Sequence, residues 1–144
     1  MEIVTNIIAA EEEEYTAIGD SACPLDEWSG IEANGLDTLK IATLHCLLTS
    51  DSLQMALDLY EPVYVSVNET VVLRMADELL EHLAALDEDA LDSVASELAA
   101  SEEFESEQWH VDDVLAQLTE LAELAQLAES QGQVLFVWMC PLQD

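Results

Sequence analysis

His45, Cys46 and Cys140 are side chains of types that bind metals or act as nucleophiles. Imidazole and thiolate suit zinc, and a thiolate beside an imidazole can serve as a nucleophile. The spacing favours neither chemistry, because the chain has no Cys-x-x-Cys and no His-x-x-x-His pair. A reactive thiol also needs a nearby cation or helix N-terminus, and the surroundings here are mostly negative. We therefore expect His45 to be a buried structural residue, and we predict no metal site and no catalytic residue.

Carboxylates dominate the chemistry of the chain, with 32 Asp and Glu against two basic residues, Lys40 and Arg74. Their abundance makes any pair of them uninformative as a glycosidase site. The run from Asp87 to Asp89 is similar to the start of a calcium loop, but the turn glycine and the bidentate glutamate are missing at the required spacing. With four glycines the chain also has no Gly-rich phosphate loop. The sequence predicts neither an enzyme nor a cofactor.

The formal net charge of -30 greatly exceeds the roughly 2 to 8 charges that keep a small domain in solution. Two cations cannot pair with 32 carboxylates, so the folded chain bears their mutual repulsion. Direct binding to nucleic acid or to an anionic membrane is excluded, because both require Lys and Arg. Three explanations of the charge stay open: a basic protein partner, imitation of nucleic-acid phosphates, and adaptation to a high-salt cytoplasm.

Two acidic segments are candidate surfaces for binding a partner. The denser one places six carboxylates around Phe104, Trp109 and His110, namely Glu102, Glu103, Glu105, Glu107, Asp112 and Asp113. Carboxylates steer a basic partner toward the surface, and a desolvated aromatic side chain such as Trp109 holds the complex. The alternative is a solvated connection whose two aromatic side chains face the core. The second segment consists of Glu11, Glu12, Glu13 and Glu14.

These features favour an acidic inhibitor or immunity protein that neutralises a basic protein, such as a nuclease toxin, by covering its positive cleft. Electrostatic steering suits this role, since capture of a toxin has to be faster than the damage it does. The alternatives are a DNA mimic of the anti-restriction or anti-CRISPR type and a halophile-type acidic protein of unrelated function. A mimic would space its carboxylates along an elongated face, whereas an inhibitor needs one compact patch with an aromatic anchor.

Strands that could position these segments are indicated at three places. Ile3 to Ala10 is rich in β-branched residues, and four glutamates that could open a helix follow it. Tyr60 to Val67 contains Pro62, which favours the edge of a sheet. Gln133 to Met139 is apolar on both faces, as in a central strand. Between the first two, Gly19 to Gly35 has the composition of a loop, anchored by Leu25 and Trp28.

Helices are predicted where apolar residues recur at the helical period. Ser66 and Glu69 form a Ser-x-x-Glu capping box, so a helix should begin there. Its apolar face would comprise Val72, Met75, Ala76, Leu79 and Leu83. The other predicted helices are a largely buried one from Leu36 to Thr49, one capped by Asp87 that reaches Ala100, and a long one from about Asp112 to Ser130 that Gly132 ends.

Several of these segments resemble the YfbM-like family of bacterial proteins of unknown function. GLDTLKIATLHCLLTS is similar to the family's signature helix, with matches at Leu36, Asp37, Leu44, His45, Leu47, Leu48 and Thr49. YVSVNETV resembles its strand-to-helix entry, SQGQVLFVWM its closing strand, and Trp109 an aromatic that precedes the last long helix. Ile41, Ser50 and the lopsided charge depart from the family pattern. The resemblance covers most of the chain from Leu36 onward and implies a mixed α+β fold with a small sheet and no known activity.

The length of 144 residues favours one domain, residues 1–144. We expect an α+β fold of four to five helices packed on a small mixed sheet of about three strands. The odd set of Cys23, Cys46 and Cys140 indicates a reducing compartment rather than a disulfide framework. The first residues lack the features of a signal peptide, and no apolar run is long enough to span a membrane. These features predict a cytoplasmic protein.

Overall fold

The computed structural model describes residues 3–21, 23–33, 38–49, 52–67, 69–106 and 108–141, and only the backbone of Ile3, Glu103 and Pro141. Across these ranges five strands form one antiparallel sheet in the order β2-β1-β5-β4-β3. The strands are β1 (Ile3–Ala10), β2 (Ser29–Glu32), β3 (Pro62–Val65), β4 (Val71–Arg74) and β5 (Val134–Pro141). The helices are α1 (Tyr15–Asp20), α2 (Thr38–Thr49), α3 (Leu53–Leu59), α4 (Asp77–Ala84), α5 (Glu88–Ala99), α6 (Glu102–Glu105) and α7 (Val111–Ser130), with short 3-10 turns η1 (Glu12–Glu14) and η2 (Pro24–Asp26).

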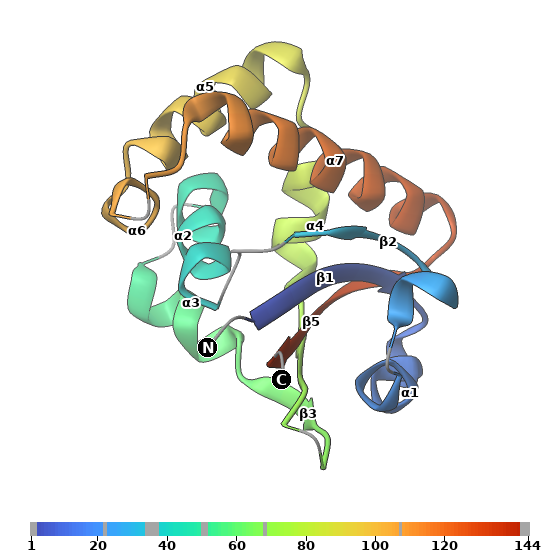
Figure 1. The fold of residues 1–144 in the computed structure, drawn as a ribbon. Helices are drawn as coiled ribbons and strands as arrows, with labels where there is room; N and C mark the ends of the chain where they lie inside the picture. The colour runs from blue at the N-terminus through green and yellow to red at the C-terminus, as the bar shows by residue number, and fades with distance from the viewer. Residues whose placement is uncertain are drawn as a thin grey trace.

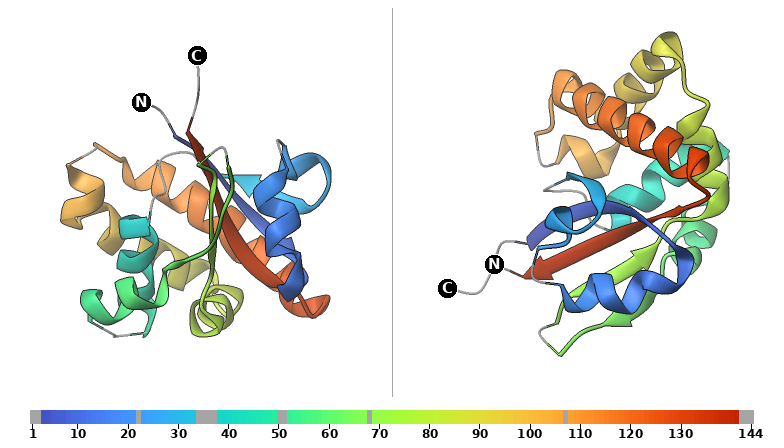
Figure 2. Two further views of the ribbon diagram at one scale, coloured as in Figure 1. Left: turned by 90° about the horizontal axis from the view of Figure 1, so that it is seen from below. Right: turned by 90° about the vertical axis from the view of Figure 1, so that its right-hand side faces the viewer.

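The centre of the sheet is the long pairing of β1 with β5, which runs from Ile3 opposite Pro141 to Ala10 opposite Val134. Successive side chains of a strand point to opposite faces, so each of these strands is buried on both sides. On one face Ile7 and Val137 join the larger hydrophobic core, which the helices from α2 to α7 cover. On the other face Ile8 and Phe136 join a smaller core beneath α1. Figure 1 and the right-hand view of Figure 2 show α1 on the face of the sheet opposite the long helix α7.

The expected architecture needs correction, although the fold is α+β. The sheet has five strands instead of about three, it is antiparallel throughout instead of mixed, and more than five helices pack with it along the described residues. Two elements explain the error in the sheet. The predicted loop from Gly19 to Gly35 contains β2, and the start of the helix predicted after Ser66 is β4.

The Ser66–Glu69 pattern belongs to a β-hairpin, so the predicted capping box is wrong. Ser66 Oγ accepts a hydrogen bond from the Thr70 amide at 3.2 Å, and the Ser66 amide donates to the Thr70 carbonyl at 2.9 Å. Glu69 has a φ of 67°, a left-handed conformation that turns the chain back on itself. The hydroxyl therefore stabilises a turn between β3 and β4, and the helix begins only at Asp77 in α4.

Other predicted elements are confirmed within a residue or two. The strand at Ile3–Ala10 has the predicted bounds, β3 lies at an edge of the sheet and β5 at its centre. Asp87 caps α5, since its Oδ1 accepts from the Ala90 amide at 2.8 Å. The long helix is α7, and Gly132 follows it with a φ of 68°. Leu36 and Asp37, at the start of the helix predicted from Leu36 to Thr49, lie outside the described residues.

Candidate protein interface

The denser acidic segment spans α6 and the start of α7. Glu102 and Glu105 of α6 and Asp112 and Asp113 of α7 are exposed, as expected of a surface that meets a partner. Glu107 and the side chain of Glu103 lie outside the described part of the chain. The described carboxylates of this segment are thus presented to solvent.

The two aromatic residues of this segment turn inward. Phe104 is 1% exposed, and half-buried Trp109 packs edge-on against it with ring centroids 5.3 Å apart. The Trp109 amide donates to the Phe104 carbonyl at 3.1 Å, which holds the turn between α6 and α7. Phe104 is therefore a core residue, and only the outer part of Trp109 contributes to the surface.

The second acidic segment opens the helical stretch after β1. Glu11, Glu12 and Glu13 are exposed, while Glu14 is half-buried. Glu14 Oε2 accepts from the Glu11 amide at 2.9 Å, and Glu12 lies 3.3 Å from Arg74 Nε in an ion pair without hydrogen-bond geometry. Since two of its four glutamates serve the fold, this segment offers a partner less free charge than α6 and α7 do.

Of the two basic side chains, Lys40 is buried, and Arg74 is partly exposed but paired with carboxylates. Lys40 on α2 is 2% exposed, with Nζ 5.9 Å from the centroid of the Phe104 ring. Arg74 at the end of β4 pairs with Glu12, and its Nη2 lies 3.0 Å from Asp77 Oδ1. The exposed ionised side chains are consequently almost all carboxylates, and an approaching molecule meets an anionic surface.

The exposed hydrophobic side chains gather on one stretch of the described chain, from α2 to the turn after β3. Nine of the twelve large apolar residues that are exposed lie between Leu39 and Val67. Three of them, Met55, Leu59 and Val63, line one open groove of about 570 Å³. We call these three residues and Val65, which β3 presents two positions after Val63, the apolar face; their exposed fractions run from 41% to 58%.

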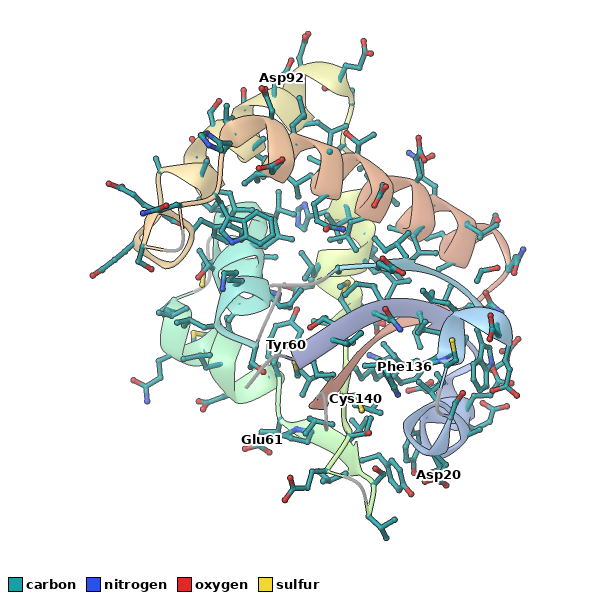
Figure 3. All side chains as sticks on the ribbon, in the orientation of Figure 1. Asp20, Tyr60, Glu61, Asp92, Phe136 and Cys140 are labelled. Carbon is teal, nitrogen blue, oxygen red and sulfur yellow. The ribbon has the colours of Figure 1, made fainter. Side chains whose placement is uncertain are left out.

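Carboxylates frame the apolar face. Asp77 and Glu78, at the start of α4, line the groove together with Arg74, which pairs with Asp77. Asp58 and Glu61 are exposed on α3 and just after it. Figure 3 shows Tyr60 directed into the molecule and Glu61 directed outward at this junction. An apolar centre with a charged rim is the composition of a protein interface, in which the centre is desolvated and the rim stays wet.

The part of the apolar face on α3 and the acidic segment of α6 lie along the same side of the molecule. Helix α2 contacts both α3 and α6. Figure 1 and the left-hand view of Figure 2 agree in placing α6, α2 and α3 along that side. Sequence reasoning singled out the carboxylates but missed the apolar face. No local pattern marks this face, because Asp58 and Glu61 stand among its apolar residues.

His45 is buried, as predicted, with no exposed surface. Its Nδ1 lies 3.1 Å from the Tyr60 hydroxyl, and burial raises the pKa of that phenol, so Tyr60 keeps its proton. Cys23 is exposed, but a hydrogen bond with Asp26 raises the pKa of its thiol, which disfavours the reactive thiolate. Neither arrangement supports nucleophilic chemistry.

Neither a metal-ligand cluster in the described part of the chain nor similarity to a known protein points to a function for the chain. Among the described residues, no three His, Cys, Asp or Glu side chains gather as metal ligands. None of the described helices combines the length and the apolar character needed to cross a bilayer. No protein-family model matches the chain, and no curated protein or solved structure does either.

Proposed function

We propose that the protein is an acidic inhibitor of the immunity type, which binds a basic protein in the cytoplasm and covers the positive cleft of that partner, as in a nuclease toxin. The observation that carries this proposal is the excess of exposed carboxylates over exposed cations. Lys40 is buried, and Arg74, the other cation, is 26% exposed and paired with Glu12 and Asp77, so little positive charge on the surface opposes a cationic partner.

The two kinds of surface have different roles in the proposed complex. Exposed carboxylates of α6 and α7 attract the partner over a distance of about 10 Å at moderate salt, which speeds association. The apolar face then loses water against the partner, which slows dissociation. Trp109 contributes its exposed part to the edge of this contact.

The apolar face favours an inhibitor over a DNA mimic. A mimic needs carboxylates at regular spacing on an extended surface, because the protein it blocks reads phosphates. Met55, Leu59 and Val63 have no counterpart on the outside of a nucleic-acid duplex. The resemblance to the YfbM-like family stays a prediction and adds no activity to this proposal.

The test is capture of basic proteins from the native host with the protein as immobilised bait. We expect a basic partner to be retained at low salt. Its binding should weaken at about 500 mM salt, where the Debye length is only a few ångströms.

Replacing Glu102, Glu103, Glu105 and Glu107 with Gln should slow association with that partner without loss of stability. The control replaces Glu81, Glu88, Glu97 and Glu129 with Gln, which removes the same charge from other helices. Recovery of no basic protein at low salt would contradict the proposal.

A further inference from the structure

The outer edge of β2 presents backbone groups that do not pair with β1. The Ala33 amide donates to the Thr5 carbonyl of β1 at 2.8 Å, so alternate residues Ile31 and Ser29 also direct their backbone groups to β1. Gly30 and Glu32 therefore direct theirs away from it. The Glu32 carbonyl agrees with this alternation, since it accepts from Gln117 Nε2 of α7 at 3.4 Å. Among the described residues, none pairs with the outward N–H and C=O of Gly30.

These backbone groups face an open groove between β2 and α7. The groove has a volume of about 400 Å³, and it is lined by Ser29, Gly30, Ile31, Glu120, Glu123, Leu124 and Leu127. Leu127 is 36% exposed, and Glu120 and Glu123 are both exposed. The groove thus combines an open strand edge, an apolar wall and two carboxylates one helical turn apart.

Tight packing fixes the backbone of Gly30 at this edge. A Cβ atom at Gly30 would lie 2.6 Å from the Ile7 carbonyl oxygen and 2.7 Å from Ile8 Cδ1, so the position admits no side chain. The opposite edge of the sheet is different, because β3 carries Pro62 and a register shift between Pro62 and Tyr64. Proline and irregular pairing protect an edge strand from further pairing. The described edge of β2 has neither a proline nor a register shift, and α7 covers it only at Glu32, through Gln117.

The carboxylates of Glu120 and Glu123 favour a basic ligand in the groove. In an extended strand, side chains that point to the same face are about 7 Å apart, close to the separation of residues one helical turn apart. Two alternate Lys or Arg residues of an added strand would therefore reach Glu120 and Glu123. A second copy of this chain is a poor occupant, because each copy carries a formal charge of -30 and lacks basic residues at its own edge.

We propose that this groove binds an extended, basic segment of a partner protein, which adds to the sheet as a sixth strand beside β2. The backbone of the segment pairs with Gly30, alternate Lys or Arg side chains pair with Glu120 and Glu123, and the aliphatic stems of these side chains lie on Leu127. This inference rests on the proposed function only in taking the partner to be basic. The groove lies at the opposite edge of the sheet from β3 and the apolar face.

The first test uses two synthetic peptides of about ten residues, a usual strand length, that alternate Lys with Thr. One is unmodified, and the other carries N-methyl groups on alternate amides, so it keeps its charge but cannot complete a strand ladder. We expect the unmodified peptide to bind at least about tenfold more tightly by fluorescence anisotropy, since pairing with the N–H and C=O of Gly30 supplies two hydrogen bonds. It should also protect the Gly30 amide from hydrogen exchange. Equal binding of the two peptides would leave only nonspecific charge attraction and would overturn the proposal.

The second test changes the protein. The double variant Glu120→Gln/Glu123→Gln should lower the affinity for the unmodified peptide about fivefold. This is the combined effect expected from the loss of two exposed ion pairs. The control Glu88→Gln/Glu97→Gln removes the same charge from α5, and it should weaken the peptide less than twofold. An equal effect of the two double variants would overturn the assignment of the groove.

The outcomes separate this inference from the proposed function. If the host partner is captured but neither the N-methyl groups nor the groove variants affect peptide binding, the inhibitor proposal survives and the strand-addition site is wrong. If the peptide binds as expected but no basic host protein is captured, the groove stands and the inhibitor proposal is wrong.

Discussion

Asp87 has two opposing effects on stability: its side chain caps α5, and its charge adds to the repulsion among the carboxylates. Its side chain accepts from the Ala90 amide at 2.8 Å at the start of α5, while the residue adds to the repulsion of the whole chain. We expect Asp87→Ala to lower the free energy of unfolding by about 1 kcal/mol, the usual value of an N-cap. Asp87→Asn keeps the acceptor and removes the charge, so it should be as stable as the wild type or slightly more stable. Urea unfolding of both variants measures the difference, and equal loss in both would show that charge rather than the cap matters at this position.

Tyr60 makes the stability of the protein fall at alkaline pH. The phenol is 2% exposed, and burial raises its pKa above the ordinary value of 10.0. In the unfolded chain the phenol ionises from about pH 10, whereas in the folded protein it stays neutral. Its contribution to stability is therefore complete below pH 10 and falls as the pH rises toward the folded-state pKa.

The variant Tyr60→Phe tests this dependence. It should be less stable at pH 8 by about 1 to 3 kcal/mol, because the buried His45 Nδ1 loses the hydroxyl as a partner. Between pH 9 and about 11 its stability should fall less than that of the wild type. Tyr15→Phe, at a position that is 37% exposed, is the control and should retain the wild-type decline. Parallel slopes for wild type and Tyr60→Phe in urea unfolding would exclude Tyr60 as the source.

At the scale of elements, α3 and β3 present apolar side chains that the fold does not need. Met55 is 58% exposed and Leu59 is 54% exposed. Changing both to Gln should alter the free energy of unfolding by no more than about 0.5 kcal/mol, since surface changes of this kind are nearly neutral and Gln retains helix propensity. Capture of the basic partner should fall at least about tenfold, as expected when interface anchors are removed. Tyr15→Gln, at a site on α1 that is 37% exposed, is the matched control. If the double variant still captured the partner fully, α3 would not be part of the interface.

Elements whose residues interact locally could be predicted from the sequence. The stripe of α7 and the cap at Asp87 depend on neighbours within one or two turns, so spacing alone locates them. The strand Ser29–Glu32 depends instead on pairing with β1, which lies twenty or more positions earlier in the chain. Its Gly30 is a residue type that is common in turns. Ser66 shows the limit most clearly, because a hydroxyl that accepts a nearby amide serves a hairpin as well as a helix start. The run of β-branched residues at Val71 and Val72 was the signal for a strand.

The candidate interface was predictable only in its charge. The sequence shows that carboxylates greatly outnumber cations, but not that Lys40 lies under Phe104 or that Arg74 joins η1 to α4. Likewise α2 is apolar on nearly all sides, which predicts a largely buried helix, yet Leu39 is 40% exposed and Leu47 is 37% exposed. Which side of such a helix stays uncovered depends on the tertiary packing of α3 to α6, and no local pattern encodes it.

At the scale of the whole molecule, the net charge makes salt act in opposite directions on folding and on binding. Raising the salt from about 10 mM to about 500 mM shortens the Debye length from about 30 Å to about 4 Å, which screens the repulsion among carboxylates. We expect Tm to rise by about 5 °C over this range, while the rate of association with a basic partner falls at least about tenfold. Differential scanning calorimetry and stopped-flow binding measure the two effects. The variant that replaces Glu102, Glu103, Glu105 and Glu107 with Gln should show a smaller response in both. A protein adapted to a high-salt cytoplasm would instead be unfolded at 10 mM salt, so a native circular dichroism spectrum under that condition separates the inhibitor from the halophile-type alternative.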